Sequence, residues 1–296
     1  MRHLENAFKF TFKNFLLTLP FLISVAIPAI ITGVGSLGLI ANSTIFINDF
    51  KKMMEDLTYG SSTFDYSRFF ETLNLGPFIA SLAISGLISL VLTIIIKPAT
   101  YGLINLHYET GNAKLSDISG CMSKYIGRFI LFLLLSLAIG IGLVIVFYIL
   151  IFILILVATA SKAIGVILLI LFILAFLVGF VALSIYMILW FPAVCVEDSG
   201  IIEGLKNSFR TVKGSFWPIL GITLLVTICG SIASTIIGAI LSWVPILGSM
   251  VGPVIGGLAD FILIVYYFDI YREKTGRLNF SEPPQQFNGF QDGSVQ

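Results

Sequence analysis

GLKNSFRTVKGSFW, residues 204–217, lies between two long apolar runs and carries three basic residues but no acid. Its apolar side chains recur at helical spacing, and Lys206, Arg210 and Lys213 lie between them. This pattern is typical of an amphipathic helix that lies along a membrane surface. Gly214 permits a bend, after which a new apolar run begins at Phe216. The stretch therefore predicts a basic surface helix that leads into a membrane span.

The composition of the chain is that of a membrane protein. Of its 296 residues, 57% are hydrophobic and 11% are charged, whereas a soluble domain has about 25% charged residues. Several apolar runs reach the roughly 20 residues needed to cross a bilayer, and their unbroken apolarity favours helices over a barrel. We therefore predict an all-α polytopic domain, residues 1–276, with six transmembrane helices at about 15–40, 78–96, 129–159, 163–191, 216–243 and 247–270.

The distribution of lysine and arginine predicts the orientation of the spans, because cytoplasmic segments are enriched in both residues. With the N-terminus inside, the cytoplasmic segments hold every base, Lys97 included, except Lys51, Lys52, Arg68 and Lys162. We expect a multi-pass protein of a prokaryotic cytoplasmic membrane, with both termini in the cytoplasm.

Two other segments, 3–15 and 117–129, share the pattern of residues 204–216. In each, apolar or small residues precede a final phenylalanine at intervals that trace one face of a helix. We therefore predict three helical-hairpin repeats, each preceded by a cytoplasmic amphipathic helix; independent membrane-entry signals of similar pattern are the alternative. Gly127 takes the place of Gly214 in the second segment. The aligned positions include Ala7, Cys121 and Ser208, and Thr11, Tyr125 and Val212.

The bases of these segments are expected to lie at the level of the lipid headgroups. Each contributes about 1 kcal/mol near an anionic surface. The expected partners are therefore membrane lipids, above all anionic ones, with a protein partner or a homo-oligomer also open. The predicted lipid-surface residues are Lys9, Lys13, Lys124, Arg128, Lys206, Arg210 and Lys213.

Acidic residues lie at the cytoplasmic ends of the returning spans. We expect them to pair with the bases of the neighbouring amphipathic helices and to hold those helices against the bundle. Exposed pairs contribute only about 0–1 kcal/mol each, so their expected role is positioning rather than stability. The predicted positioning acids are Glu109, Glu197, Asp198 and Asp269.

Asp260 is the one acid inside an apolar run. Ionisable residues within a membrane are costly and mark candidate functional sites. Asp260 could bind a proton or cation in a transport path, or it could be a neutral, hydrogen-bonded structural group. No basic residue is expected at a span centre to pair with it.

Gly248, Gly252 and Gly256 repeat at four-residue spacing just before Asp260, with Pro253 and Gly257 among them. Small residues at this spacing let two helices approach closely, so tight packing against another span is the favoured interpretation. The alternative is a broken helix whose freed carbonyl groups line a cavity, as in transporters.

The sequence contains no catalytic constellation. Its only histidines, His3 and His107, lie outside the predicted spans, and no HExxH or P-loop motif is present. GVGSLG, residues 33–38, fits a dinucleotide-binding pattern but lies within an apolar span, where helix packing explains it better. The three cysteines are far apart. We therefore predict a protein that is not an enzyme and has no cofactor or metal, and the net charge of +1 gives no reason to expect a nucleic-acid partner.

Two segments lie outside the predicted spans. The outer loop 41–76 contains FINDFKKMMEDL, residues 46–57, whose apolar residues predict a short surface helix. A lid over a pore is the alternative for this loop. Residues 277–296 are polar and contain Pro283-Pro284, which predicts a disordered cytoplasmic tail.

VEDSGIIEGLKNSFRTVKGSFWPILGI, residues 196–222, resembles the membrane domain fused to some bacterial glycerophosphodiester phosphodiesterases, and related six-span membrane proteins. VYYFDIYREKTG, residues 265–276, is similar to the closing motif of the same group. The resemblance covers the last third of the chain, and the rest only by topology. It implies a six-span membrane domain without hydrolase activity, because the hydrolase of that family is a separate soluble domain. The residues that carry it are Glu197, Glu203, Ser208, Phe209, Arg210, Gly214, Phe216 and Trp217.

These observations favour a non-enzymatic integral membrane protein that engages the cytoplasmic lipid surface or organises membrane partners. The alternative is a small transporter or channel that uses Asp260 and the Gly248–Gly257 segment. A polar cavity that reaches Asp260 would favour transport, whereas a dry, glycine-packed core would disfavour it.

Overall fold

The computed structural model describes residues 2–41, 43–59 and 75–277, and these residues form helices without any strand. Within them are six helical segments that are long and apolar enough to cross a membrane. Because a bilayer offers no water to backbone polar groups, apolar runs adopt helices, which satisfy those groups internally. The predicted all-α, multi-pass membrane protein is confirmed.

The amphipathic helices α1 and α9 come directly before the candidate spans α2 and α10. A short connection separates most consecutive helices. The helices are α1 (Arg2–Lys13), α2 (Phe15–Ala41), α3 (Ser43–Tyr59), α5 (Leu75–Thr110), the 3₁₀ turn η1 (Leu115–Asp117), α6 (Ile118–Ala160), α7 (Lys162–Met187), α8 (Trp190–Glu197), α9 (Ile201–Lys213), α10 (Phe216–Leu241) and α11 (Pro245–Lys274).

The bend predicted at Gly214 is present, since α9 ends just before this residue and α10 begins just after it. The corresponding bend at Gly127 is absent, and that expectation is wrong: α6 continues unbroken through this position. Tyr125 and Phe129 lie one turn apart, and both are buried against the same core. A straight helix buries both side chains, so the second amphipathic segment is the first part of a span helix.

The fourth predicted span, 163–191, is divided between α7 and α8, with a turn at residues 188–189. Pro192 accounts for this break. It has no N–H to donate to the carbonyl of Ile188, and its ring disfavours a continuous helix at that point.

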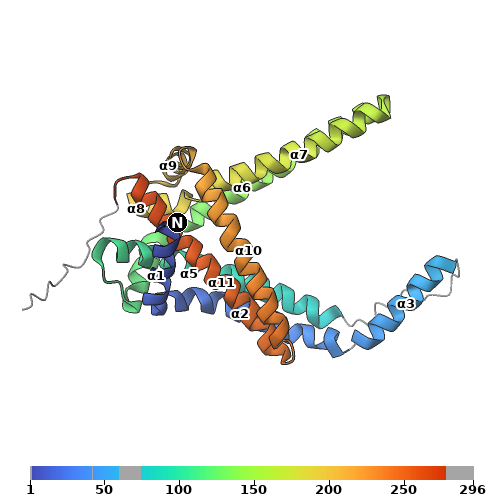
Figure 1. Ribbon diagram of the computed structural model, residues 1–296, viewed down its shortest axis with the longest axis horizontal. Helices are drawn as coiled ribbons and strands as arrows, with labels where there is room; N and C mark the ends of the chain where they lie inside the picture. The colour runs from blue at the N-terminus through green and yellow to red at the C-terminus, as the bar shows by residue number, and fades with distance from the viewer. Residues whose placement is uncertain (1, 42, 60–74, 278–296) are drawn as a thin grey trace, which may run out of the picture.

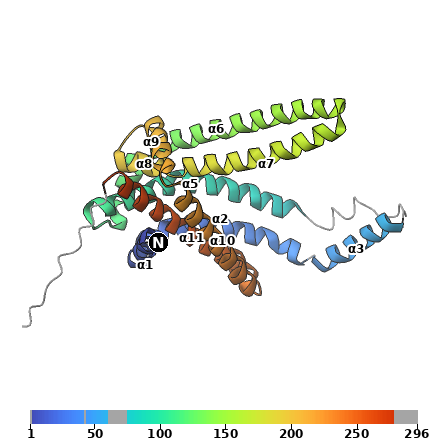
Figure 2. The same cartoon turned by 45° about the horizontal axis from the view of Figure 1, so that its top comes forward.

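Four spans form the packed body of the molecule. Helix α2 packs against both α5 and α11, and α10 packs along α11. Helix α6 packs on α5 and then projects from the body together with α7, so that the two form a long hairpin (Figure 2). Consecutive spans therefore pair as α2 with α5, α6 with α7, and α10 with α11.

One end of the molecule gathers α1, α8, α9, the first turns of α6 and the last turns of α11 (Figure 1). We call it the basic end. The opposite end carries α3 and the turn between α6 and α7. The bases on the elements of the basic end are Arg2, Lys9, Lys13, Lys114, Lys124, Arg128, Lys206, Arg210, Lys213, Arg272, Lys274 and Arg277.

The most buried part of the chain is the second half of α11. Every residue from Phe261 to Arg272 is buried, so this half-helix is enclosed on all sides. Its helix contacts α1, α2, α5, α8 and α10. An enclosed helix must be apolar all round or have its polar groups paired. Asp269 and Arg272 are the charged residues in this stretch, and their partners are described below.

The helix predicted for residues 46–57 is present within α3, which projects beyond the end of α2 (Figure 1). Its Phe50 and Met54 side chains are exposed. A lid function for this segment stays a prediction. Residues 60–74 of the outer loop, and the predicted disordered tail from residue 278 onward, lie outside the described residues.

The glycine stripe of α11 lies against α10. The Ser234 hydroxyl of α10 donates a 2.7 Å hydrogen bond to the carbonyl of Gly252, and Gly256 lies beside the same serine. Gly248 approaches the backbone of Ser242 and Gly238. Close packing through small residues is therefore what this stripe does on the α10 side.

The GVGSLG segment of α2 also packs through its glycines. A methyl group built on Gly33 would come within 1.9 Å of the Ser249 hydroxyl, and one on Gly35 within 1.9 Å of the Ser81 hydroxyl. These contacts join α2 to α11 on one side and to α5 on the other, as expected for helix packing rather than for nucleotide binding.

We predict that Gly252→Val lowers the stability of the protein by about 1–3 kcal/mol, because added side-chain volume at a close helix contact forces backbone shifts. A Cβ at this position already lies 3.2 Å from the Ser234 carbonyl oxygen. Thermal unfolding in detergent measures the effect. Gly221→Val is the matched control on α10, since nothing lies within 4 Å of a Cβ there. Equal losses in both variants would contradict the packing role.

Candidate functional site

A polar groove lies between α2, α5 and α11. Its volume is about 490 Å³. It extends from Ser36 and Ser249, near the end opposite the basic end, to Lys97 and Asp260. A polar cavity therefore reaches Asp260 within the membrane-spanning part of the molecule. The hydroxyl groups that line it belong to Ser24, Thr32, Ser36, Ser85, Ser89, Thr93 and Ser249.

These lining residues form stripes along two helices. Side chains four positions apart lie on the same helix face, so each stripe turns toward the groove. Hydropathy does not reveal either stripe, because scattered serines and threonines do not interrupt an apolar run. A search for polar residues at four-residue spacing would have found them. The stripes are Ser85, Ser89, Thr93 and Lys97 on α5, and Ser24, Pro28, Thr32 and Ser36 on α2.

Hydrogen bonds at the middle of the groove tie α2 to α5. The Thr32 hydroxyl lies 2.9 Å from the Ser85 hydroxyl, and both lie within 3.1 Å of the Pro28 carbonyl oxygen. Pro28 has no N–H for the carbonyl of Ser24, which belongs to the same stripe. The wall thus offers hydroxyl groups and the carbonyl oxygen of Ser24, which lacks its usual helical N–H donor.

Lys97 lines the groove together with Asp260, and the two charges interact across it. Asp260 therefore has a basic residue on the same groove, which the predicted span boundaries did not indicate. Lys97 was assigned to the cytoplasmic segment just beyond the predicted span 78–96, and α5 continues through it to Thr110. The helix continues past Lys97 because apolar residues beyond it, such as Leu103 and Ile104, are buried in the protein core.

Lys97 and Asp260 line the same groove, but these two described side chains do not form a direct ion pair. Asp260 is an exposed residue, so its carboxylate is accessible. Each charge can therefore contact a polar solute in the groove.

An aromatic layer follows the groove on the side of the basic end. Phe21 lines the groove, and its ring lies 6.0 Å from that of Phe261, the residue after Asp260. Tyr101 continues this layer, with its ring 5.7 Å from Phe268 and 5.0 Å from Phe191. Along the molecule, hydroxyl groups are thus followed by a pair of charges and then by apolar rings.

The broken-helix alternative for Gly248–Gly257 is wrong, because α11 is one continuous helix from Pro245 to Lys274. Pro253 removes a single helical hydrogen bond, and the glycine stripe packs the same region onto α10. The groove uses another face of α11, which carries Pro253 and Asp260. This helix therefore presents glycines to α10 and polar groups to the groove.

Asp269 is wholly buried at the basic end. Its carboxylate accepts from Asn6 at 3.3 Å and from the Tyr108 hydroxyl at 3.4 Å, and it lies 2.6 Å from His3 Nδ1. His3 Nε2 lies 2.6 Å from the Glu273 carboxylate. The imidazole thus bridges two carboxylates of α11 and fastens α1 to that helix. The pairing expected for Asp269 is present, with a histidine as the base.

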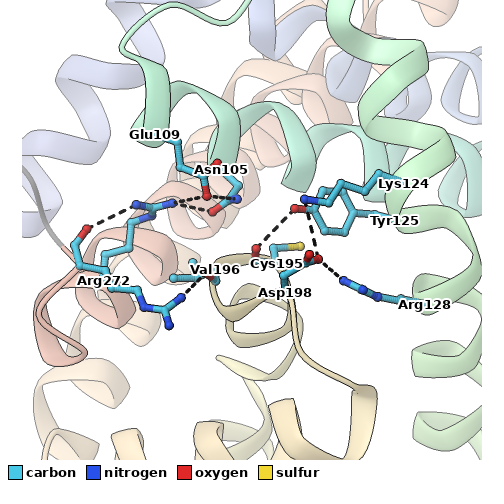
Figure 3. A network of polar contacts seen from close by, with 10 residues as sticks. Asn105, Glu109, Lys124, Tyr125, Arg128, Cys195, Val196, Asp198 and Arg272 are labelled. Carbon is cyan, nitrogen blue, oxygen red and sulfur yellow. Dashed lines mark hydrogen bonds and ion pairs between the residues drawn. The ribbon is translucent and has the colours of Figure 1, made fainter.

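Arg272 is the buried cation of the same half-helix. Its Nη2 donates a 2.7 Å hydrogen bond to Asn105 and lies 3.4 Å from Glu109 (Figure 3). Asn105 in turn donates to Glu109 at 2.8 Å. The prediction that Glu109 pairs with an amphipathic helix is wrong, because the long α5 places this acid beside the end of α11.

Asp198 follows α8 and faces the first turns of α6 (Figure 3). It accepts a hydrogen bond from Arg128, and Lys124 Nζ lies 3.7 Å away. The hydrogen bond from Arg128 lowers the pKa of Asp198. The expected acid–base pair is present, and its exposure limits its contribution to stability.

Glu197 is bound by neutral donors. It accepts a 2.5 Å hydrogen bond from the Tyr271 hydroxyl and another from the Asn207 amide of α9. The expected pairing with a base of α9 is therefore wrong, although the acid does connect α9 to the end of α11.

The predicted lipid-surface residues all lie at the basic end, in different surroundings. Lys9 pairs with Glu5 at 2.6 Å within α1, and Lys124 and Arg128 pair with Asp198. Of these seven residues, those for which the described part of the chain provides no ion-pair partner are Lys13, Lys206, Arg210 and Lys213, and all four are exposed.

Most residues of the face shared by the three amphipathic segments are buried against protein. Small residues suit this close contact with the bundle, and the larger Phe8, Phe12 and Phe209 remain exposed. The aligned face is therefore divided: its Ala7 and Ser208 positions pack on the bundle, whereas Phe8 and Phe209 of the same face are exposed. The buried residues of that face are Ala7, Thr11, Cys121, Tyr125, Ser208 and Val212.

Among the described residues, no group of three or more His, Cys, Asp and Glu side chains is arranged to hold a metal ion. The groove instead offers hydroxyl groups and one charge of each sign. This chemistry suits a small polar or charged solute.

A family model described as Domain of unknown function (DUF7847) matches residues 62–268. The matched region takes in α5 to the second half of α11, and therefore both Lys97 and Asp260. No curated protein and no solved structure matches the chain.

We predict that His3→Ala loosens α1 from α11. The substitution removes two contacts to carboxylates and leaves the buried Asp269 with fewer donors, which costs about 1–3 kcal/mol. Limited trypsin digestion in detergent measures the release of α1 as faster cleavage at Lys9 and Lys13. Glu5→Gln is the control, because it removes only an exposed pair within α1. Unchanged cleavage in the His3 variant would contradict the fastening role.

Proposed function

The chain belongs to the DUF7847 family of unknown function, and we propose that it is a transporter or channel for a small polar or charged solute. The observation that carries this proposal is the groove that joins Lys97 and Asp260 to a line of hydroxyl groups. Charged residues inside a membrane are costly and usually serve ion or solute pathways. Two helices that each supply a charge to one groove fit such a pathway.

The size of the groove supports the same proposal. Binding sites for small molecules enclose about 300–1,000 Å³, and the groove holds about 490 Å³. Its hydroxyl groups can replace water around a solute, and the aromatic layer beyond Asp260 supplies a barrier on the other side. The path is thus polar toward one end of the molecule and apolar toward the other.

We propose that the basic end faces the cytoplasm of a prokaryotic cell, with both termini inside. The bases gathered on α1, α6, α9 and α11 support this orientation, since lysine and arginine accumulate on the cytoplasmic side. In this orientation the groove opens toward the outer side, and the aromatic layer lies toward the cytoplasm.

Engagement of anionic lipids at the cytoplasmic surface is a second proposed role. It is favoured by the exposed bases of α9, which point away from the face that packs on the bundle. Organisation of a membrane partner or a second copy would use the same surface.

We also propose two evolutionary relationships. The first is the origin of the three hairpins by repetition, which the shared buried face of the amphipathic segments supports. The second is the kinship with the membrane domain of glycerophosphodiester phosphodiesterases, which rests on the motif at residues 196–222.

Asp260→Asn should abolish solute flux, because the carboxylate is the charge that a permeating solute meets at the end of the groove. The measurement is uptake of radiolabelled sodium, chloride and glycine into proteoliposomes, which tests a cation, an anion and a zwitterion. Uptake of at least one probe above protein-free vesicles is expected, with loss of at least tenfold in the variant. Glu55→Gln on α3 is the control and should retain uptake. The proposal would be overturned if no probe were taken up, or if the Asp260→Asn and Glu55→Gln variants showed equal uptake.

Water in the groove can be tested without a known solute. In a chain carrying Cys229→Ala, we expect Ser89→Cys to react with a membrane-impermeant maleimide added on the side opposite the basic end. Val91→Cys lies on the exposed apolar face of the same helix, and it should react at least tenfold more slowly, because a thiolate does not form in hydrocarbon. Equal rates at both positions would mean that the groove is not filled with water.

A further inference from the structure

A second cavity, of about 1080 Å³, lies between α6 and α9. Its α6 wall consists of Leu131, Leu134, Leu135 and Ala138, and its α9 wall includes Lys206 and Arg210. One side is therefore apolar and the other basic. The groove described above uses neither helix, so the two cavities are independent.

The apolar wall belongs to a membrane span. Leu131 and Leu134 are more than half exposed, at 58% and 57%, and they lie in the candidate span Leu115–Thr159. Exposed apolar side chains on such a span suit contact with acyl chains. The cavity therefore connects the hydrocarbon region with the headgroup region, where the amphipathic α9 lies.

The basic wall is free to bind an anion. Lys206 and Arg210 are one helical turn apart and exposed, and within the described part of the chain neither has a hydrogen-bond or ion-pair partner. Other bases of this end are engaged, for example Arg128 with Asp198. Glu203 also lines the cavity, which leaves a net charge of one positive unit on this wall.

Helix α9 is held firmly in place. The indole N–H of Trp190 donates a 2.7 Å hydrogen bond to the Ile201 carbonyl, and the Ser208 hydroxyl donates a 2.6 Å bond to the Tyr186 carbonyl. A Cβ at Gly204 would come within 2.3 Å of Val194. The two bases therefore stand on a fixed helix, which lowers the ordering cost of binding.

We infer that this cavity binds one anionic phospholipid of the surrounding leaflet, with its phosphate at Lys206 and Arg210 and an acyl chain along Leu131–Ala138. The inference rests on the second proposed role, lipid engagement at the basic end, and assigns it a discrete site. An amphiphile is the ligand that matches an apolar wall and a basic wall in one cavity. Charge complementarity selects an anionic headgroup over a zwitterionic one.

The test counts bound lipid on the purified full-length protein. Native mass spectrometry during titration with phosphatidylglycerol should detect one tight site that phosphatidylcholine does not fill. Replacing both bases, Lys206→Gln with Arg210→Gln, should weaken this site roughly 30-fold, at about 1 kcal/mol for each charge. The matched control is Lys9→Gln with Lys13→Gln on α1, which removes the same charge away from the cavity and should leave the tight site intact.

A third variant tests the apolar wall without changing any charge. Leu134→Trp fills the cavity from α6 and should also lower phosphatidylglycerol occupancy, with thermal unfolding unchanged because the position is exposed. If the α9 and α1 charge variants weaken phosphatidylglycerol binding equally, the interaction is a general attraction to the basic surface. This result would overturn the discrete site but not the lipid role. No weakening by either would overturn the lipid role as well. Loss of a dimer in the Leu134 variant, without loss of lipid, would assign the cavity to a second copy of the chain.

Discussion

The wholly buried carboxylate of Asp269 is the constraint on which the basic end depends. A buried charge is tolerated only when it is paired and hydrogen-bonded. Helix α11 cannot supply these partners itself, because its backbone groups already bond to one another. They come from His3 and Asn6 of α1 and from Tyr108 of α5. The buried Arg272 also needs polar partners, and it donates to Asn105 and pairs with Glu109. One span, α5, and the surface helix α1 thus supply the partners of one half-helix.

The other half of α11 explains how a polar groove can exist beside a closely packed body. Its glycine stripe brings α11 against α10, while the face with Asp260 is left toward α5. At the basic end, Arg272 of α11 bonds to Asn105 of α5. In the middle of the groove, Thr32 of α2 bonds to Ser85 of α5. A dry, glycine-packed contact and a polar cavity therefore occur on different faces of the same helix. A polar cavity and a glycine-packed contact were expected as alternatives, and the structure contains both.

The membrane spans could be predicted because hydropathy depends on composition over about 20 residues and needs no knowledge of neighbours. The partners of individual charges could not. Asp198 was predicted to have a basic partner and has one. Glu109 instead pairs with α11, and Glu197 bonds to both α11 and α9 through neutral side chains. No local pattern in the sequence indicates these partners. The place of Lys97 on the groove could not be predicted for a related reason, because a span boundary drawn at the first charge does not say which helix that charge faces.

By itself, the sequence determined that this protein is helical, crosses a membrane with six apolar segments and gathers its bases on a few short elements. These properties follow from composition and from helical periodicity, which are local. Only the tertiary structure decided that Asp260 faces Lys97, that hydroxyl groups from two helices line their groove, and that α9 holds two bases opposite an apolar wall of α6. Each of these depends on how helices rotate against one another, and that rotation is set by close glycine contacts and by the partners that buried charges require.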